Sequence, residues 1–325
     1  MGDKVQDQGS RRRAGIALAL AVALALGVIV ATKIMQDRAA RQPVLLPTVE
    51  MPMDDSPQCA ELVAALPDSL GRLQRAELAE PAPTGAALYR DFTDDRVTVR
   101  CGAPVPAQYT TLSRTVEAGD VTWLRVADDT PDLDLVTWFS VGTSPIVAVT
   151  GSSDHDDVLP EIAGRMGAGF GAGPEPGPLP LTDLAAPAAD GRCEGLLAAL
   201  PAAIAERDRL GEGDLPEGMT LPPATAAWAN ADGDAITLRC GVAEPAGYAA
   251  MADPANDGDR QLTQVGDIVW FTDAERSSGT TATYFALGRE RIVAVHLPVA
   301  VSSGVLPELS ATIAANLENT APSEE

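Results

Sequence analysis

The chain contains the stretch Val97-Thr98-Val99-Arg100-Cys101-Gly102 and, later, a second version of it, Ile236-Thr237-Leu238-Arg239-Cys240-Gly241. Both versions alternate apolar and polar residues, which is typical of a β-strand with one face turned to a core. In both versions the cysteine lies on the apolar face and the arginine lies on the opposite face. We therefore expect two equivalent strands, each of which contributes one cysteine to a hydrophobic core.

Five further landmarks surround the two strands in the same order. They are a short helix signal (59–67 and 193–201), a strand ending in tryptophan (119–123 and 266–270), an aromatic pair (138–139 and 284–285), an apolar strand (146–149 and 292–295) and a helix start (158–161 and 305–308). A period this long indicates duplicated domains, because solenoid units are much shorter. We therefore expect a tandem duplication.

The helix signals place a second cysteine in each repeat. Cys59 and Cys193 are each followed by apolar residues at helical spacing, so they face the same core as the strand cysteines. The simplest arrangement is one disulfide within each repeat, Cys59–Cys101 and Cys193–Cys240. Pairing between repeats and a redox role for the cysteines are the alternatives. Ser56 and Asp190 stand where a helix N-cap is expected.

The landmarks of the second repeat carry a resemblance to a known family. Its Cys-x-x-Leu-Leu-x-x-Leu-Pro helix, the triplet at 226–228 and the strand that ends in Cys240-Gly241-Val242 resemble the actinobacterial DUF3515 family. The resemblance is close over 193–317 and looser in the first repeat, where Ala87-Leu88-Tyr89 replaces Ala-Ala-Trp. It implies an anchored or secreted envelope protein, and it supplies no catalytic residue.

An apolar segment near the start predicts a membrane anchor. Residues 14–32 are 19 residues without a charge, between Arg13 and Lys33. As a helix they would be about 28 Å long, close to the roughly 30 Å of a hydrocarbon core. We predict a cytoplasmic N-terminus at 1–13 and an uncleaved transmembrane helix at 14–34, because the charged exit at 33–38 is a poor cleavage site.

The remaining chain divides by composition. We expect a tether at 35–56, a first repeat at 57–167, a Gly/Pro-rich linker at 168–189, a second repeat at 190–318 and a tail at 319–325. Because no long crossover helix separates the strands, each repeat should be a two-layer α+β domain. We expect a mainly antiparallel sheet of four or five strands with flanking helices, and each domain should fold independently of the other.

Charge and cysteine content restrict the possible partners and the cellular compartment of the protein. Residues 1–41 hold seven Lys/Arg and three Asp of the full chain's 23 and 46, so residues 42–325 carry 16 Arg against 43 Asp/Glu, a net charge of −27. Such acidity argues against nucleic acid as a partner. The core-facing cysteines suit an oxidising compartment. We therefore expect a single-pass protein of the plasma membrane, with the bulk of the chain extracytoplasmic.

Few residues of the chain are of the types that catalyse reactions or bind cofactors and metals. Both lysines lie in residues 1–41, so the remaining chain has no lysine for a phosphate-binding loop, a Schiff base or a Ser-x-x-Lys acyl enzyme. His155 and His296 are the only histidines. The acidic turns at 154–157 and 256–259 lack the ligand spacing of a calcium loop. We predict no metal site, no cofactor and no catalytic residue.

Four residues are candidates for ligand binding. Arg100 and Arg239 could recognise a carboxylate or phosphate, or could pair with an acidic residue of a neighbouring strand. Trp123 and Trp270 could line a ligand cleft, or could fill the core.

These observations favour a non-catalytic envelope binding or interaction protein. The partner would be an envelope protein or an envelope ligand, and two modules joined by a flexible linker would allow bivalent binding. The alternatives are an extracytoplasmic carboxylate-based hydrolase of cell-wall material and a structural spacer.

Overall fold

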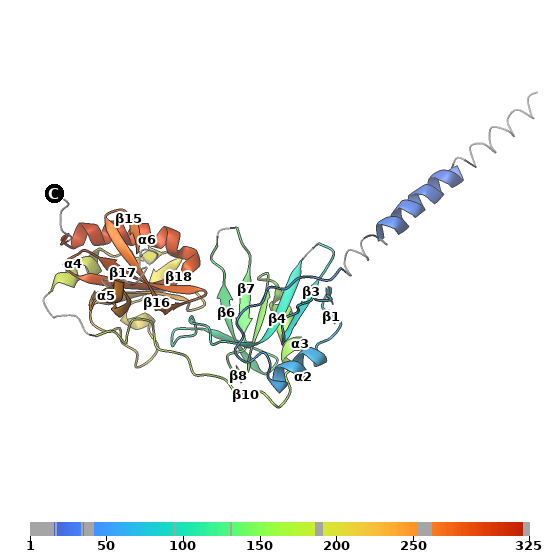
Figure 1. Ribbon diagram of the computed structural model, residues 1–325, viewed down its shortest axis with the longest axis horizontal. Coiled ribbons are helices and arrows are strands. Elements are labelled where there is room, and N and C mark those ends of the chain that lie inside the picture. The colour runs from blue at the N-terminus through green and yellow to red at the C-terminus, as the bar shows by residue number, and fades with distance from the viewer. Residues whose placement is uncertain are drawn as a thin grey trace, which may run out of the picture.

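The protein contains two sheets of the same topology, as the computed structural model shows (Figure 1). The structure describes residues 16, 18–33, 35, 42–93, 95–130, 132–185, 191–251 and 262–320. The predicted cytoplasmic residues 1–13, the acidic turn at 256–259 and the chain after 320 lie outside the described residues, as does Asp190.

The first sheet has eight strands in the order β1-β2-β3-β4-β9-β7-β6-β5, and all its pairings are antiparallel. Two helices, α2 (Pro57–Ala65) and α3 (Leu159–Ala163), pack on one face of it. The strands are β1 (Ser69–Leu70), β2 (Leu73–Arg75), β3 (Ala86–Arg90), β4 (Arg96–Ala103), β5 (Thr115–Ala118), β6 (Val121–Ala127), β7 (Val136–Phe139) and β9 (Ile146–Gly151). A separate hairpin joins β8 (Thr143–Ser144) to β10 (Gly171–Ala172).

The second sheet repeats this order as β11-β12-β13-β14-β18-β17-β16-β15. Helices α4 (Arg192–Ala199) and α6 (Ser302–Asn316) cover its core face, and the short α5 (Ala246–Met251) contacts β16. The strands are β11 (Ala203–Ile204), β12 (Arg207–Arg209), β13 (Thr225–Ala229), β14 (Ala235–Val242), β15 (Leu262–Val265), β16 (Ile268–Ser278), β17 (Thr281–Leu287) and β18 (Ile292–Pro298).

The predicted pair of antiparallel sheet domains is confirmed, but each sheet has eight strands where the sequence predicted four or five. The additional strands include the hairpins β1–β2 and β11–β12, whose strands are two or three residues long. Such short strands show no alternation that a sequence pattern could detect.

The N-terminal apolar segment is helical over residues 18–33, and its large apolar side chains are exposed. Residues 14, 15, 17 and 34 of the predicted transmembrane helix lie outside the described residues. Across the part of the chain that the structure describes, no helix combines the length and the apolar character that a membrane span requires.

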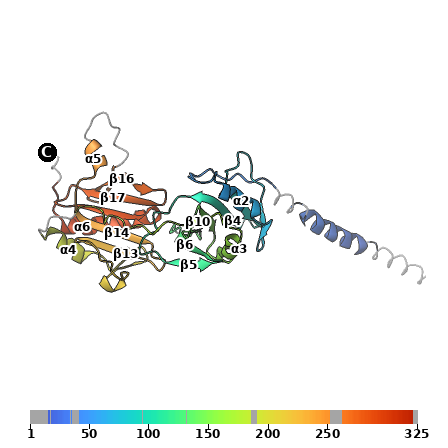
Figure 2. The ribbon, with the colours of Figure 1, turned by 90° about the horizontal axis from the view of Figure 1, so that it is seen from below.

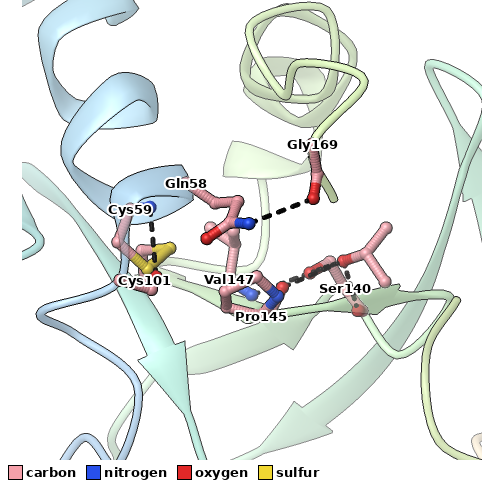
Figure 3. The surroundings of a disulfide bond; sticks show 9 residues. Gln58, Cys59, Cys101, Ser140, Pro145, Val147 and Gly169 are labelled. Carbon is pink, nitrogen blue, oxygen red and sulfur yellow. Dashed lines mark hydrogen bonds between the residues drawn. A yellow bond between two sulfur atoms is a disulfide. The ribbon is translucent and has the colours of Figure 1, made fainter. Parts of the chain in front are cut away.

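The predicted disulfides are confirmed, one in each repeat. Cys59 is joined to Cys101 and Cys193 to Cys240, with Cα–Cα distances of 5.3 and 5.9 Å. Each bond ties a helix to the central strand of its sheet and lies in the core. Figure 3 shows the Cys59–Cys101 bond of the first repeat. Ser56 caps α2 by accepting a hydrogen bond from the Cys59 amide, as expected. Helix α4 begins differently, at Gly191 with a φ of 74° and no side-chain cap.

The backbone conformation explains why a glycine follows each strand cysteine. Gly102 and Gly241 have φ angles of 91° and 78°, and both lie at irregularities in the pairing of the central strand. A Cβ atom on Gly102 would lie 2.3 Å from the Asp54 amide nitrogen. The Cys-Gly pair therefore combines a disulfide with a bulge that only glycine fits without strain.

We expect the variant Cys193→Ala/Cys240→Ala to lose about 4 kcal/mol of unfolding free energy, because the bond closes a loop with a sequence separation of 47 residues. Chemical denaturation of the full chain measures this loss. The matched variant Cys59→Ala/Cys101→Ala should lose a similar amount, since its separation is 42. A loss below about 1 kcal/mol in both variants would contradict a stabilising role for the disulfides.

Candidate functional site

The two candidate arginines are buried and bind backbone carbonyls. Arg100 Nη2 donates to the Pro47 carbonyl at 2.8 Å, and Arg239 Nη1 donates to those of Leu181 and Thr182 at 2.8 and 3.1 Å. Their side chains lie opposite the disulfides, as predicted, with exposed fractions of 9% and 2%. Burial lowers the pKa of both guanidinium groups. The partners are therefore chain segments rather than acidic residues.

The segment that each arginine binds is a strap across the outer face of its sheet. In the first repeat, Val44 forms a parallel bridge with Leu78, and Met51 packs on the outer-face cluster. In the second repeat, Leu181 is buried in a cluster with Phe271 and Phe285. These straps come from the stretches that composition assigns to the tether and the linker. Both faces of the two central strands are consequently covered.

The two candidate tryptophans lie in the cores, each with an exposed fraction of 0%. Trp123 Nε1 donates to the Ala118 carbonyl at 3.1 Å, and Trp270 Nε1 donates to Ser310 Oγ at 2.9 Å. Both are part of the clusters that contain the disulfides. The structure therefore places these tryptophans in packing positions, and it does not bring the four candidate residues together.

A buried arginine joins the two repeats. Arg207 has an exposed fraction of 1%, and its Nη2 atom lies 2.5 Å from Asp129 Oδ2 of the first repeat and 2.6 Å from Asp234 Oδ2 of the second. Burial disfavours its charge, but the two carboxylates outweigh this and raise the pKa of Arg207. The equivalent position in the first repeat is the core residue Leu73. The second repeat therefore has an ionic contact where the first has a core leucine.

Three further contacts hold the repeats together. Arg125 forms an ion pair with Asp232, and the Asp232 carbonyl accepts a hydrogen bond from the Arg114 amide at 2.9 Å. Gln108 Nε2 donates to Thr280 Oγ1 at 2.9 Å. Figure 2 shows β5 and β6 of the first repeat on the side that faces the second repeat. The expectation of two modules on a flexible linker is therefore replaced by two repeats in direct contact.

A cleft opens where the repeats meet. We call it the inter-repeat cleft; its first hollow, of about 310 Å³, lies between the β6–β7 hairpin of the first repeat and the ends of β17 and β18 of the second. A second hollow, of about 440 Å³, shares Asp128, Asp129 and Thr130 with the first. The first hollow has a largely apolar lining that includes Val126, Ala127, Leu135, Pro298, Val299 and Ala300.

The second hollow is acidic. It is lined by Asp128, Asp129 and Glu206, and of these only Asp129 is paired with an arginine among the described residues. Ala205 and Glu206 form the β11–β12 turn with φ angles of 47° and 60°. Two consecutive non-glycine residues in this conformation are strained, and Arg207 supports the turn by donating to the Ala205 carbonyl at 2.8 Å. The acidic wall is therefore held in place by the inter-repeat contact.

The two histidines lie away from the cleft lining. His155 Nε2 lies 3.3 Å from Asp95 Oδ2, and its Nδ1 lies 3.0 Å from Ser152 Oγ. His296 Nδ1 lies 2.9 Å from Thr283 Oγ1, whose proton is donated to the Arg276 carbonyl. Nδ1 of His296 therefore donates to the threonine. Within the described residues, no group of three His, Cys, Asp or Glu side chains is arranged to hold a metal ion.

The class that these features define is a tandem repeat of disulfide-bonded α+β domains with a cleft at the contact between them. The chain belongs to the family described as "Protein of unknown function (DUF3515)", which matches residues 18–168 and 166–322. The two matches correspond to the two repeats. No curated protein and no solved structure matches the chain.

Sequence reasoning missed the residues of the contact. Arg207 follows Cys193 by the same interval as Leu73 follows Cys59, so a residue-by-residue alignment of the repeats would have revealed a charge at a core position. Asp129 lies in the loop after β6 and Asp232 lies in a turn, and acidic residues are common in such segments and carry no specific signal. Only the arginine was accessible to prediction.

We expect the variant Asp129→Ala/Asp232→Ala to loosen the contact, because it removes both inter-repeat ion pairs and leaves Arg207 paired with Asp234. Spin labels on cysteines at the exposed positions 61 and 308 should show a distance distribution at least twice as wide as in the parent. The control is Asp183→Ala, which removes an ion pair between the strap of the second repeat and Arg276 of β16. Equal widths in both variants would contradict the role of these pairs.

We expect a pH-dependent stability from His296, whose pKa is lowered by burial to about 4 from an ordinary 6.5. As the pH falls from 6.5 to 4, the unfolded chain takes up a proton that the folded chain does not. The unfolding free energy should therefore fall by about 3 kcal/mol over this range. His296→Thr, which copies Thr150 of the first repeat, should remove this component in denaturation curves at pH 4.5 and 7. An unchanged pH dependence of the unfolding free energy in that variant would contradict the role of His296.

Proposed function

We propose that this protein is a non-catalytic, membrane-anchored binding protein of the cell envelope, and that the inter-repeat cleft is its binding site. The anchor is the apolar segment at 14–34, which continues helically through 18–33. The repeats then lie on the extracytoplasmic side. The two disulfides support this placement, because such bonds persist in oxidising compartments.

The observation that carries the proposal is the position of the cleft. Its walls come from both repeats, and the contact that holds them depends on Arg207, which replaces a core leucine of the first repeat. Ligand sites occur preferentially at domain contacts, as apolar hollows with a few polar groups at fixed positions. Gln108 and Thr280, which are hydrogen-bonded to each other across the contact, are polar groups of this kind at the apolar end of the cleft.

The lining favours binding over hydrolysis. A carboxylate-based hydrolase needs one carboxyl group with a raised pKa, so that it can act as the acid. Burial raises the pKa of Asp234, but this carboxylate is held by Arg207 and does not line the cleft. Asp128 and Glu206 do line it, and they have no arginine partner among the described residues. The cleft gives a ligand apolar contact area and a few polar contacts, which is sufficient for recognition.

The test is site-specific photocrosslinking in intact native cells. A photoreactive residue at the exposed Thr280, in the cleft, should give a cross-linked adduct that remains in the membrane fraction after a high-salt wash. The same residue at the exposed Glu308, on helix α6, should give none. Mass spectrometry of the purified adduct identifies the partner.

Adducts of equal yield at both positions, or none at either, would contradict a binding role for the cleft. Recovery of the adduct in the soluble cytosolic fraction would contradict the anchored, extracytoplasmic placement.

A further inference from the structure

We propose that the inter-repeat cleft binds a basic peptide segment, one in which a lysine or arginine stands next to aliphatic residues. This inference rests on the proposed function and specifies the chemistry of the partner. It follows from the apolar and acidic hollows, which have the lining residues 128–130 in common and therefore adjoin.

The apolar hollow sets the first requirement. Of its lining residues, Val299 is 43% exposed, and Val126 and Pro298 are buried. An exposed aliphatic side chain beside an apolar wall gains free energy when a second apolar group covers it. The volume of about 310 Å³ fits a short run of side chains rather than a folded domain.

The acidic hollow determines the charge that the ligand must carry. Asp128 accepts a hydrogen bond from the Thr130 amide at 3.0 Å, and no cation among the described residues pairs with it or with Glu206. Asp129 is paired with Arg207, which it shares with Asp234. Two uncompensated carboxylates therefore remain at the end of an apolar hollow, on a body of net charge −27 over residues 42–325. A cationic side chain complements them, and an acidic ligand would be repelled.

The positions of the two hollows determine how far apart the aliphatic and basic residues of the peptide can be. Because the apolar and acidic hollows adjoin at 128–130, the aliphatic and basic residues of the ligand must be neighbours in its sequence. Lysine and arginine suit this junction, since their aliphatic stems pack on apolar surface while the charged group remains at the polar end.

The experiment measures fluorescence anisotropy of labelled hexapeptides with the purified full-length chain in detergent. The probe is acetyl-Ala-Leu-Val-Lys-Arg-Ala-amide. One comparison peptide replaces Leu-Val with Ser-Ser, and another replaces Lys-Arg with Glu-Glu. We expect the probe to bind at least tenfold more tightly than either comparison peptide at low ionic strength, with an affinity that falls as salt is added.

Matched variants separate the site from the overall charge. Asp128→Asn/Glu206→Gln should lower the affinity for the probe at least tenfold. Glu61→Gln/Glu308→Gln changes the net charge equally at exposed positions of helices α2 and α6, and it should alter the affinity less than twofold. Equal loss in both double variants, or tighter binding of the acidic peptide, would overturn the proposal.

Two outcomes distinguish this inference from the proposed function. If the hexapeptide fails to bind but a cross-linked adduct forms at position 280 and not at 308, the basic ligand class is wrong and the binding role stands. If neither binding nor a position-specific adduct is found, both the ligand class and the binding role are wrong.

Discussion

The central strand of each sheet is buried on both faces, and the remaining architecture follows from this constraint. On the inner face of β4 and β14 the cysteine is bonded to a helix, so the sheet and its cover are covalently joined. On the outer face the arginine has carbonyl groups of a strap as its partners. A buried guanidinium group without hydrogen bonds would be costly, so the strap and the arginine require each other.

The ends of the first helix of each repeat are fixed by matched contacts. Arg75 donates to the Val63 and Leu66 carbonyls at the end of α2, and Arg209 donates to those of Leu197 and Leu200 at the end of α4. The proline carbonyl that follows each helix accepts a hydrogen bond from Tyr89 or Trp228. These bonds satisfy carbonyl groups that a helix end leaves unpaired. The two repeats therefore share the bonds that maintain their internal structure.

The differences between the repeats lie at their contact. Asp95 and Asp234 occupy equivalent positions before the central strand; Asp95 is paired with Arg72 and His155 of its own repeat, whereas Asp234 is paired with Arg207. The arginine of the second repeat also reaches Asp129 of the first, and this directs the strained turn at 205–206 toward the cleft. The duplicated fold thus has a cleft that a single repeat could not form.

The sequence alone determined the features that depend on local periodicity. Alternation and helical spacing placed Cys59 with Cys101 and Cys193 with Cys240, and the repeated order of landmarks predicted two antiparallel sheet domains. The tertiary structure alone decided what covers the outer faces and how the repeats meet. The Pro47 and Leu181 carbonyls are backbone groups that no residue type reveals, and Asp129 lies 78 residues from Arg207 in the chain. Contacts of this kind depend on how the folded chain brings distant segments together, which periodicity within one segment does not record.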